Sequence, residues 1–490
     1  MTPIRKLFIA NRAEIALRIV RSARRLGIAS VVPWHAKDRH GPALAEADPT
    51  VELVGDAPVS AWLDADGLIR AARESGCDAI HPGYGFLSEN AGFARAVQAA
   101  GLVWVGPGPE AIELMGDKVS ARRFAVRHGV PVTPSADEAD DPATFAERAR
   151  AVGLPLLVKG AAGGGGKGMQ IVRDGAQLAE AIATARRESE RYFGDGRLFA
   201  ERFVERPRHI EVQVFGDAHG HVIHLGEREC SIQRRFQKLI EEMPAPGLAP
   251  ALRERICAAA VTLARAAGYV NAGTVECIVS PAGEFFFLEM NTRLQVEHPV
   301  TEMVTGLDLV ELQIRVAEGH PLPLAQADVR WHGAAIECRL LAEDADAGFV
   351  PDTGAVRLLR WPQGPGLRVD AGVTEGAAVT ADFDSLLAKL VAHGATRELA
   401  VSRLVQALQD TVMLGVTLNA DYLARVLRHL AFGVGEIDTG FLDRHRDALR
   451  PAPLTEAERH LLLAVAAVAA REPAARAAGL PHAAMGAWRN

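Results

Sequence analysis

Residues 273–297 read GTVECIVSPAGEFFFLEMNTRLQVE, and this stretch decides the fold that the sequence predicts. Two strand-like segments flank the turn at 281–283, which indicates a β-hairpin. Glu276 and Glu289 are equally far from that turn, so the hairpin places them opposite each other on one face. Because two facing carboxylates repel, a sheet tolerates them only beside a compensating cation. The spacing therefore predicts a divalent metal site.

Polar and apolar residues continue to alternate beyond the hairpin. Polar side chains occupy every second position, and Met290, Thr292, Leu294 and Val296 lie between them; the polar positions are Asn291, Arg293, Gln295 and Glu297. If the chain stays extended, one face carries three carboxylates, counting Glu276. The solvated face of an amphipathic strand explains the alternation but not the opposed glutamates. Since Mg²⁺ takes a few carboxylate oxygens plus substrate phosphates, Glu276, Glu289 and Asn291 suit Mg²⁺ bound with ATP.

A glycine-rich loop lies upstream, at residues 160–168, which read GAAGGGGKG between two apolar strand-like segments. Backbone N–H groups approach phosphate oxygens closely only where side chains are absent. Lys159 and Lys167 add positive charge there, and Gly168 excludes a Walker A motif, which requires Ser or Thr at that position. The alternative is a flexible linker, which explains neither the flanking strands nor the lysines. We therefore expect a phosphate-binding loop.

The N-terminal region alternates strands and helices. Strand patterns at 6–10, 30–34 and 79–80 are separated by helical patterns at 14–25 and 66–74. Such alternation predicts a parallel sheet with right-handed crossovers. Ligands of such sheets bind beyond the carboxyl ends of the strands, which is where His81-Pro82-Gly83 falls.

Two polar clusters are less specific. Residues 229–242 carry many charges, and a surface ion-pair network explains them as well as a binding site does. Residues 208–213 alternate like a half-buried strand, so His209 taken alone favours a structural role. Neither cluster names a function.

Length, composition and net charge limit the classes of protein to which this chain can belong. A chain of 490 residues that is 49% hydrophobic can bury a large core in two to four lobes. A net charge of -7 argues against a nucleic-acid partner. The five cysteines form no CxxC pair, which favours reduced thiols. The longest apolar run, at 461–470, is about half of a membrane span, so we expect a cytoplasmic α/β protein with no membrane association.

Taken together, the motifs resemble the biotin carboxylase family over nearly the whole chain, to about residue 446. The resemblance rests on the glycine-rich loop and on IANR (9–12), HPGYGFLSEN (81–90), MGDK (115–118), PRHIE (207–211), QRRFQK (233–238), EMNTRLQVEHP (289–299), ECR (337–339) and SLLAKL (385–390). It implies an α/β fold with an ATP-grasp core, in four segments. These are an N-terminal doubly wound parallel-sheet domain (1–120), an ATP-grasp domain (121–320) with a lid at about 131–204, a C-terminal mixed domain (321–446) and a helical linker (447–490).

The resemblance also implies a reaction: ATP and bicarbonate carboxylate biotin through carboxyphosphate, with Mg²⁺ or Mn²⁺ as metal. The residues that it implies for ATP are Lys118 and Lys159 for the phosphates, Gly165 and Gly166 in the lid, Glu201, Arg202, Phe203, Val204 and His209 around adenosine, and Gln233 and Phe236 at the inner edge. Those that it implies for bicarbonate are Lys238, Arg293, Gln295 and Val296, with Glu297 as general base. Arg339 resembles the residue that stabilises the biotin enolate, and Glu276, Glu289 and Asn291 resemble the metal ligands.

Some positions depart from the family pattern, among them Ala13 after Asn-Arg and Phe236 where His or Asn is usual. None removes an implied catalytic group. Two rival functions stay open: another ATP-grasp ligase, against which Arg339 and the 233–238 segment speak, and a catalytically silent scaffold in a carboxylase assembly.

Partners follow from the same resemblance. The chain has no Ala-Met-Lys-Met biotin-attachment sequence, so we expect biotin to arrive on a carrier protein or domain. The ending GAWRN (486–490) resembles the start of a connecting domain, which suggests a chain truncated or split before a carrier domain. A carboxyltransferase subunit and a homodimer or larger assembly complete the expected partners, in an enzyme of the acyl-CoA carboxylase type.

Overall fold

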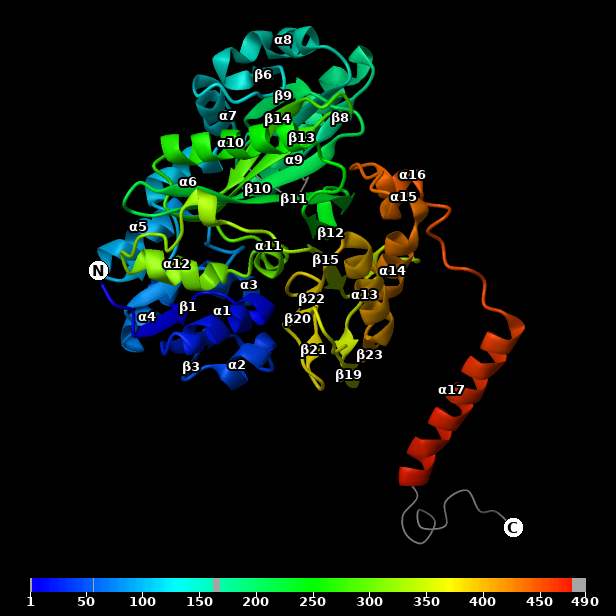
Figure 1. The fold of residues 1–490 in the computed structure, drawn as a ribbon. Helices are drawn as coiled ribbons and strands as arrows, with labels where there is room; N and C mark the ends of the chain where they lie inside the picture. Colours follow the sequence, from blue (N-terminus) through cyan, green and yellow to red (C-terminus); the bar gives the residue numbers. More distant parts are fainter. Residues whose placement is uncertain (1, 56, 162–167, 478–490) are drawn as a thin grey trace, which may run out of the picture. The chain divides into compact units, whose positions relative to one another are not determined.

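A parallel sheet forms the N-terminal part of the computed structural model, which describes residues 2–55, 57–161 and 168–477 (Figure 1). Its five strands lie in the order β3-β2-β1-β4-β5 and all pair in parallel. The strands are β1 (Lys6–Ile9), β2 (Ala29–Trp34), β3 (Thr50–Glu52), β4 (Ala79–His81) and β5 (Val103–Trp104). The helices of this part are α1 (Ala13–Arg25), α2 (Pro42–Glu46), α3 (Pro58–Leu63), α4 (Ala65–Glu74), α5 (Ala91–Ala99) and α6 (Pro109–Gly116). The predicted doubly wound sheet is confirmed.

The strand order reverses beside β1, and this switch point positions the loops of the site. Asn11, just after β1, donates from Nδ2 to the carbonyls of Pro82 (2.7 Å) and Tyr84 (2.8 Å), just after β4. Gly83 has φ +64°, and a Cβ there would lie 2.8 Å from the Asn11 amide, so this turn needs glycine. The two loops are therefore fixed together at the carboxyl ends of the strands.

A second, antiparallel sheet of eight strands runs in the order β14-β13-β10-β11-β12-β15-β22-β20. The strands are β10 (Arg208–Gly216), β11 (Val222–Arg234), β12 (Gln237–Met243), β13 (Asn271–Val279), β14 (Phe285–Asn291), β15 (Ala334–Leu341), β20 (Leu367–Ala371) and β22 (Leu386–Gly394). Because β12 pairs with β15, this one sheet continues from the predicted ATP-grasp segment into the predicted C-terminal segment. Helices α10 (Pro250–Ala266), α11 (His298–Thr305) and α12 (Leu309–Ala317) belong to the same part of the chain.

The predicted hairpin is present as β13 and β14, with Glu276 opposite Glu289 and a bulge beside Glu276. Its apolar positions, such as Val275, Cys277 and Phe287, are buried in the core. The expected extension of the strand to Glu297 is wrong, since β14 ends at Asn291. The chain then turns into α11, whose Pro299 occupies the first helical turn, where its missing N–H costs nothing.

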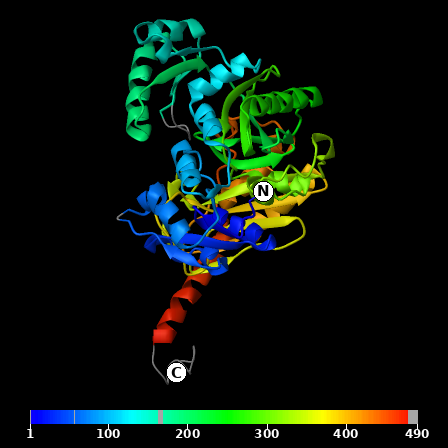
Figure 2. The same ribbon diagram turned by 90° about the vertical axis from the view of Figure 1, so that its left-hand side faces the viewer.

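A small four-stranded sheet forms the predicted lid, in the order β6-β9-β7-β8. Helix α7 (Lys118–Arg127) precedes this sheet in the chain and packs in the core formed with β10, β13 and β14. The strands of the lid are β6 (Ser135–Asp137), β7 (Leu156–Gly160), β8 (Gln170–Val172) and β9 (Leu198–Arg202), and its helices are α8 (Phe145–Val152) and α9 (Leu178–Phe193). Figure 2 shows these strands and helices, drawn in cyan to green, gathered in one lobe. Gly165 and Gly166, named from the glycine-rich loop, lie outside the described residues.

The C-terminal part packs helices on the eight-stranded sheet. Helices α13 (Arg397–Asp410) and α14 (Ala420–Arg428) share a core with β15 and β22. The remaining strands are β16 (Glu343–Asp344), β17 (Val350–Pro351), β18 (Gly354–Ala355), β19 (Leu358–Arg360), β21 (Ala378–Val379) and β23 (Val412–Leu414), and the remaining helices are α15 (Leu430–Gly433) and α16 (Phe441–Arg444).

Residues 450–490 form a separate unit, in which the predicted helix is present as α17 (Glu456–Ala477). Within the described ranges, no helix combines the length and the apolar content that crossing a bilayer needs. The five cysteines are all buried and unbridged.

Candidate active site

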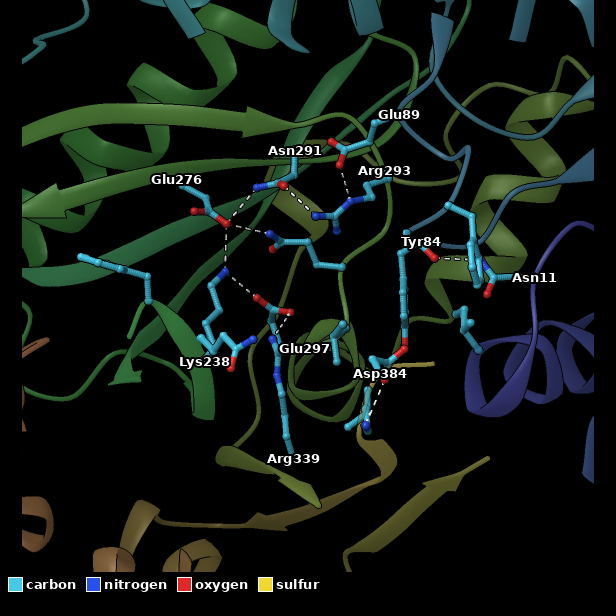
Figure 3. A pocket seen from close by; sticks show the side chains of 18 of the residues that line it. Asn11, Tyr84, Glu89, Lys238, Glu276, Asn291, Arg293, Glu297, Arg339 and Asp384 are labelled. Atoms are coloured by element: carbon cyan, nitrogen blue, oxygen red, sulfur yellow. Dashed lines mark hydrogen bonds and ion pairs between the residues drawn. The ribbon is translucent and has the colours of Figure 1, made fainter. Parts of the chain in front are cut away.

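A cavity of about 730 Å³ opens where the loops after β1 and β4 face the eight-stranded sheet (Figure 3). Many of the predicted site residues line it: Lys118, His209, Phe236, Lys238, Glu276, Glu289, Asn291, Arg293, Gln295, Val296, Glu297 and Arg339. Segments separated by more than 200 residues in the sequence thus contribute to one site, as the Glu89–Arg293 contact shows.

Lys238 lies at the centre of the polar network. Its Nζ is 2.5 Å from Glu211, 2.9 Å from Glu276 and 2.7 Å from Glu297. Burial alone would lower the pKa of Lys238, but the three carboxylates raise it well above its ordinary value. An ammonium has three N–H donors, and here each is directed at a different carboxylate. Lys238 therefore stays charged and fixed in place.

Glu297 is held on both of its carboxylate oxygens. Lys238 binds Oε1 at 2.7 Å, and the Arg339 guanidinium binds Oε2 at 3.0 Å. Burial raises the pKa of Glu297, yet Lys238, Arg339 and Arg228 together lower it far below its ordinary range. Glu297 is thus ionised at neutral pH and oriented at the turn that precedes α11.

Arg339 is in turn held by a second carboxylate, since its Nε donates to Oε1 of Glu241 at 2.6 Å. Burial raises the pKa of Glu241 to about 7 despite that guanidinium. The sequence singled out Glu241 only as part of a charged run, without a role. No periodicity could have indicated it, because residues 237–243 read QKLIEEM without alternation; the pairing of β12 with β15 is what brings Glu241 near Arg339.

Arg228 is a site residue that the sequence did not reveal. Its side chain is fully buried, donating to Glu211 at 2.5 Å and to Gln295 at 2.9 Å. Glu211, on β10, was likewise given no role. Glu211 lies in an alternating segment, whereas Arg228 stands between Glu227 and Glu229, and a buried arginine is too rare for such a pattern to indicate one.

Each of the two facing glutamates contacts a basic side chain in this structure. Glu289 pairs with Lys118, and Oε2 of Glu276 lies 3.0 Å from His209 Nε2. Asn291 donates from Nδ2 to Glu276 at 2.8 Å, so its Oδ1 is directed the other way and accepts from Arg293 at 2.8 Å. Carboxylate and amide oxygens are hard ligands, which suit Mg²⁺ or Mn²⁺. The donor set of Glu276, Glu289 and Asn291 therefore fits the predicted metal.

Glu89, in the loop after β4, orients Arg293. Its Oε2 accepts from Arg293 Nε at 2.7 Å, and its Oε1 accepts from the Thr292 backbone N–H at 3.0 Å. Figure 3 shows Tyr84, Asn11 and Asp384 on the same side of the cavity. The parallel-sheet rule had placed His81-Pro82-Gly83 near a ligand; the residues of this loop that line the cavity follow directly after them and are Tyr84, Gly85, Phe86 and Glu89.

Two of the residues predicted to bind ATP, Lys159 on the phosphate side and Glu201 on the adenosine side, meet on the lid sheet. Lys159 of β7 pairs with Glu201 of β9 at 2.5 Å, and Arg122 of α7 donates to Glu201 at 2.8 Å. Burial raises the pKa of Glu201, but Lys159 and Arg122 lower it to about 2. Among the described residues, these side chains lie apart from the lining of the 730 Å³ cavity.

The other predicted nucleotide residues lie at the end of β9, just after it, or on the eight-stranded sheet. Arg202 is the exposed last residue of β9, and Phe203 donates its backbone N–H to the Pro155 carbonyl at 2.9 Å, with Val204 next in the chain. Gln233 is buried and pairs with Lys238 across β11 and β12.

Phe236 occupies a two-residue turn between β11 and β12 with Arg235. Both have positive φ, 47° for Arg235 and 68° for Phe236, as a type I′ hairpin turn requires. The turn leaves Phe236 45% exposed beside the cavity. Where the family usually has His or Asn, this chain thus has an apolar ring at the edge of the cavity.

Family models match consecutive parts of the chain: the biotin carboxylase N-terminal domain at residues 3–112, the ATP-binding domain of the carbamoyl-phosphate synthase L chain at 117–325 and the biotin carboxylase C-terminal domain at 337–444. The biotin carboxylase of Halalkalibacterium halodurans is 46% identical over 443 residues, which cover 90% of this chain and 98% of that protein. The mitochondrial pyruvate carboxylase of Mus musculus is 45% identical over 92% of this chain, but the match spans only 39% of that protein's length.

Solved structures of biotin carboxylases have the same fold as this chain. The biotin carboxylase domain dimer of Hydrogenobacter thermophilus 2-oxoglutarate carboxylase, in complex with MgADP, ADP and bicarbonate, superposes with a TM-score of 0.90 at 40% identity, covering 92% of this chain and all of that one. Biotin carboxylase from Campylobacter jejuni gives a TM-score of 0.87 at 39% identity, covering 90% of this chain and 99% of that one. The resemblance seen in the sequence motifs is confirmed, and so is the α/β ATP-grasp fold that it implied. The chain belongs to the biotin carboxylase family of ATP-dependent ligases.

Proposed function

We propose that this chain uses ATP and bicarbonate to carboxylate biotin, which is presented on a carrier protein or domain. The observation that carries the proposal is the doubly held carboxylate of Glu297, with Lys238 on one oxygen and Arg339 on the other. This arrangement supplies an ionised base between two fixed cations, beside oxygen ligands that suit a metal. Few other reactions need a base, an anion site and a metal–nucleotide site in one cavity.

The first step joins bicarbonate to phosphate. Glu297 accepts the proton of bicarbonate, and the bicarbonate oxygen attacks the γ-phosphoryl group of ATP, so that the bond to ADP breaks and carboxyphosphate forms. Lys238 and Arg293 stabilise the anion, while Lys118 and Lys159 bind phosphate oxygens. A metal held by Glu276, Glu289 and Asn291 would neutralise charge on the phosphates. Gln295 and the Val296 backbone also bind bicarbonate, and we call this part of the cavity the bicarbonate end.

The second step transfers the carboxyl group. Carboxyphosphate splits into CO₂ and phosphate, and CO₂ forms a bond to the ureido nitrogen of biotin. The ureido proton leaves to the phosphate that has just been released, which balances the step. Negative charge develops on the ureido oxygen, and Arg339 stabilises it because a guanidinium stays charged at any working pH.

Partners and domain limits belong to the same proposal. We infer a biotin carrier and a carboxyltransferase as partners, since the relatives include pyruvate carboxylase and methylcrotonoyl-CoA carboxylase subunit alpha. A homodimer is proposed from the dimer of the Hydrogenobacter domain. Five buried, unbridged cysteines support a reducing, cytoplasmic compartment. The domain limits at 120, 320 and 446 remain predictions, as do the adenosine roles of Glu201 to Val204, His209, Gln233 and Phe236.

The test is ADP release with Mg²⁺–ATP, with and without bicarbonate and free biotin, in wild type and in Glu297→Gln. We expect release that needs bicarbonate and is stimulated by biotin, and a loss of about 10²–10⁴-fold in the variant, the range typical for a removed general base. Glu337→Gln is the matched control. Glu337 is buried on β15 and does not line the cavity, and burial raises its pKa well above the ordinary value, so glutamine imitates its protonated form.

Each contrary outcome has a definite meaning. ATP turnover that ignores biotin would assign the chain to another ATP-grasp ligase. ATP binding without any turnover would favour a scaffold. Equal losses in Glu297→Gln and Glu337→Gln would remove the special role of Glu297.

A further inference from the structure

Lys389 is a buried cation that the proposed reaction does not use. It lies in the SLLAKL run of β22, its side chain is 0% exposed, and its cross-strand neighbours are Arg339 on β15 and Asp370 on β20. Directly opposite residues of an antiparallel pair point to the same face. Lys389 and Arg339 therefore form a pair of neighbouring cations on the face of the sheet that carries the site.

The two cations hold consecutive residues of one segment. Arg339 binds the side chain of Glu297 at 3.0 Å, and Lys389 Nζ donates to the backbone carbonyl of Val296 at 2.9 Å. The strand β14 has already ended at Asn291, so no ladder hydrogen bond holds the backbone at this turn. This part-buried carbonyl lies outside regular structure and needs a donor, and Lys389 supplies it.

Buried carboxylates balance the charge of Lys389. Oε2 of Glu14 lies 3.3 Å from Nζ and Oδ2 of Asp370 lies 3.8 Å from it. Glu14 is 3% exposed, and neither of its oxygens has a hydrogen-bond partner, so the nearby cation is what compensates its burial. Glu14 belongs to α1 and Val296 to the segment before α11. Lys389 thus joins three parts of the chain at one point.

We propose that Lys389 is a positioning residue for the bicarbonate end of the site. By fixing the Val296 carbonyl, it sets the turn from which the Glu297 carboxylate reaches Lys238 and Arg339. The inference rests on the proposed function, because it assigns to Lys389 the placement of the base that the function requires. Lys389 touches no reacting group and acts only through Val296 and Glu297.

The first variant is Lys389→Met, which keeps the length of the side chain and removes its charge and donors. We expect kcat to fall about 100-fold, the loss typical when a catalytic group is displaced by about 1 Å, and the KM for bicarbonate to rise about tenfold. The KM for ATP should change less than about twofold, because Lys159, proposed to bind ATP phosphates, lies on β7 and outside the lining of the cavity to which Val296 belongs. A general loss of folding would not produce this split between the two substrates.

A double variant separates positioning from folding. Lys389→Met leaves Glu14 buried beside no cation, and adding Glu14→Gln removes that carboxylate charge. We expect Lys389→Met/Glu14→Gln to recover the melting temperature of wild type while its bicarbonate KM and kcat stay defective. Arg397→Met is the matched control. This variant removes a comparable ion pair, between Arg397 Nε and Glu242 at 2.5 Å, and Arg397 does not contact the site. It should lower the melting temperature and leave both KM values unchanged.

The outcomes are distinguishable. If wild type shows no bicarbonate-dependent, biotin-stimulated ADP release, the proposed function fails. If wild type is active and Lys389→Met retains the wild-type bicarbonate KM and kcat, only the positioning role fails. Recovery of activity together with stability in the double variant, or failure of the double variant to fold, also overturns it, because Lys389 would then serve the fold alone.

Discussion

The bicarbonate end and the nucleotide end of the site are built differently. At the bicarbonate end, Lys238, Glu297 and Arg339 lie on or beside the eight-stranded sheet. At the nucleotide end, Lys159 and Glu201 sit on a four-stranded sheet whose outer strands, β6 and β8, have 3 residues each, against 13 in β11. Glu289 keeps 30% of its side chain exposed, whereas Glu297 keeps 2%.

The difference indicates which groups are organised before substrates bind. A fixed arrangement of charges costs no reorganisation during reaction, which is most valuable where charge develops. The bicarbonate end has that property. The nucleotide end rests on fewer and shorter strands, so its groups have more to gain from the contacts of the bound nucleotide. Substitutions at either end of the site test this contrast.

Arg339→Met should have the largest effect. It removes one of the two cations on Glu297 and the group proposed to stabilise the biotin oxygen. We expect biotin-stimulated ADP release to fall by about 10²–10³-fold, the range for one lost electrostatic stabiliser, while slow biotin-independent ATP hydrolysis persists. Steady-state assays with and without biotin measure both rates. An equal loss of both would mean that Arg339 supports the whole site rather than the second step.

Glu289→Gln examines the more exposed member of the facing carboxylate pair. Loss of one metal ligand should raise the Mg²⁺ concentration needed for half-maximal ADP release by about 10-fold or more, since each carboxylate is a large part of a site with few protein ligands. Saturating Mg²⁺ should restore most of the rate, and a chelator should abolish it in wild type. An unchanged Mg²⁺ requirement would show that Glu289 serves Lys118 alone.

Arg122→Met loosens the nucleotide end only. It removes the guanidinium that holds Glu201 at 2.8 Å and the Thr133 carbonyl at 2.5 Å. We expect the KM for ATP to rise about 5- to 10-fold, equivalent to roughly one weakened charge-assisted hydrogen bond, with the KM for bicarbonate unchanged. Substrate titrations at fixed concentrations of the other substrate separate the two constants. A parallel rise in the KM for bicarbonate would mean that the two ends are coupled.

Glu14→Gln should have the smallest effect and should depend on pH. Burial raises the pKa of Glu14 to about 7, even though Lys389 opposes this, with Asp370 and Asp384 adding to the rise. Because the folded pKa exceeds the unfolded one, the native protein loses stability as pH rises from about 4.5 through 7, by about 1–3 kcal/mol. The glutamine variant lacks this loss. Its melting temperature relative to wild type should therefore increase between pH 5.5 and 8, and a constant difference would contradict the burial effect.

Local patterns predicted much of the fold. The helix at 14–25 and the strands at 6–10, 30–34 and 79–80 are present within a residue or two as α1, β1, β2 and β4. The facing pair Glu276 and Glu289 followed from counting residues around a turn, because side-chain direction in a hairpin has a period of two. These features depend on neighbours in sequence, which is why periodicity and turn residues suffice.

The same rule failed where the chain left the strand. Alternation predicted that Asn291, Arg293, Gln295 and Glu297 share an extended face, but β14 ends at Asn291. The four side chains nevertheless line one cavity, since Glu89, Arg228 and Arg339 hold them from other elements. The prediction of a shared site was confirmed for a reason that the pattern did not contain.

By itself, the sequence determined the family, the first strands and helices, the hairpin of β13 and β14, and the types of side chain that the chemistry needs. Only the tertiary structure decided that β12, β15 and β22 lie side by side, so that Glu241, Arg339 and Lys389 meet around Val296 and Glu297. The physical reason is that these contacts join residues up to 98 positions apart in the sequence. Burial then makes each charge depend on a partner from another strand, and no local periodicity specifies which strand that will be.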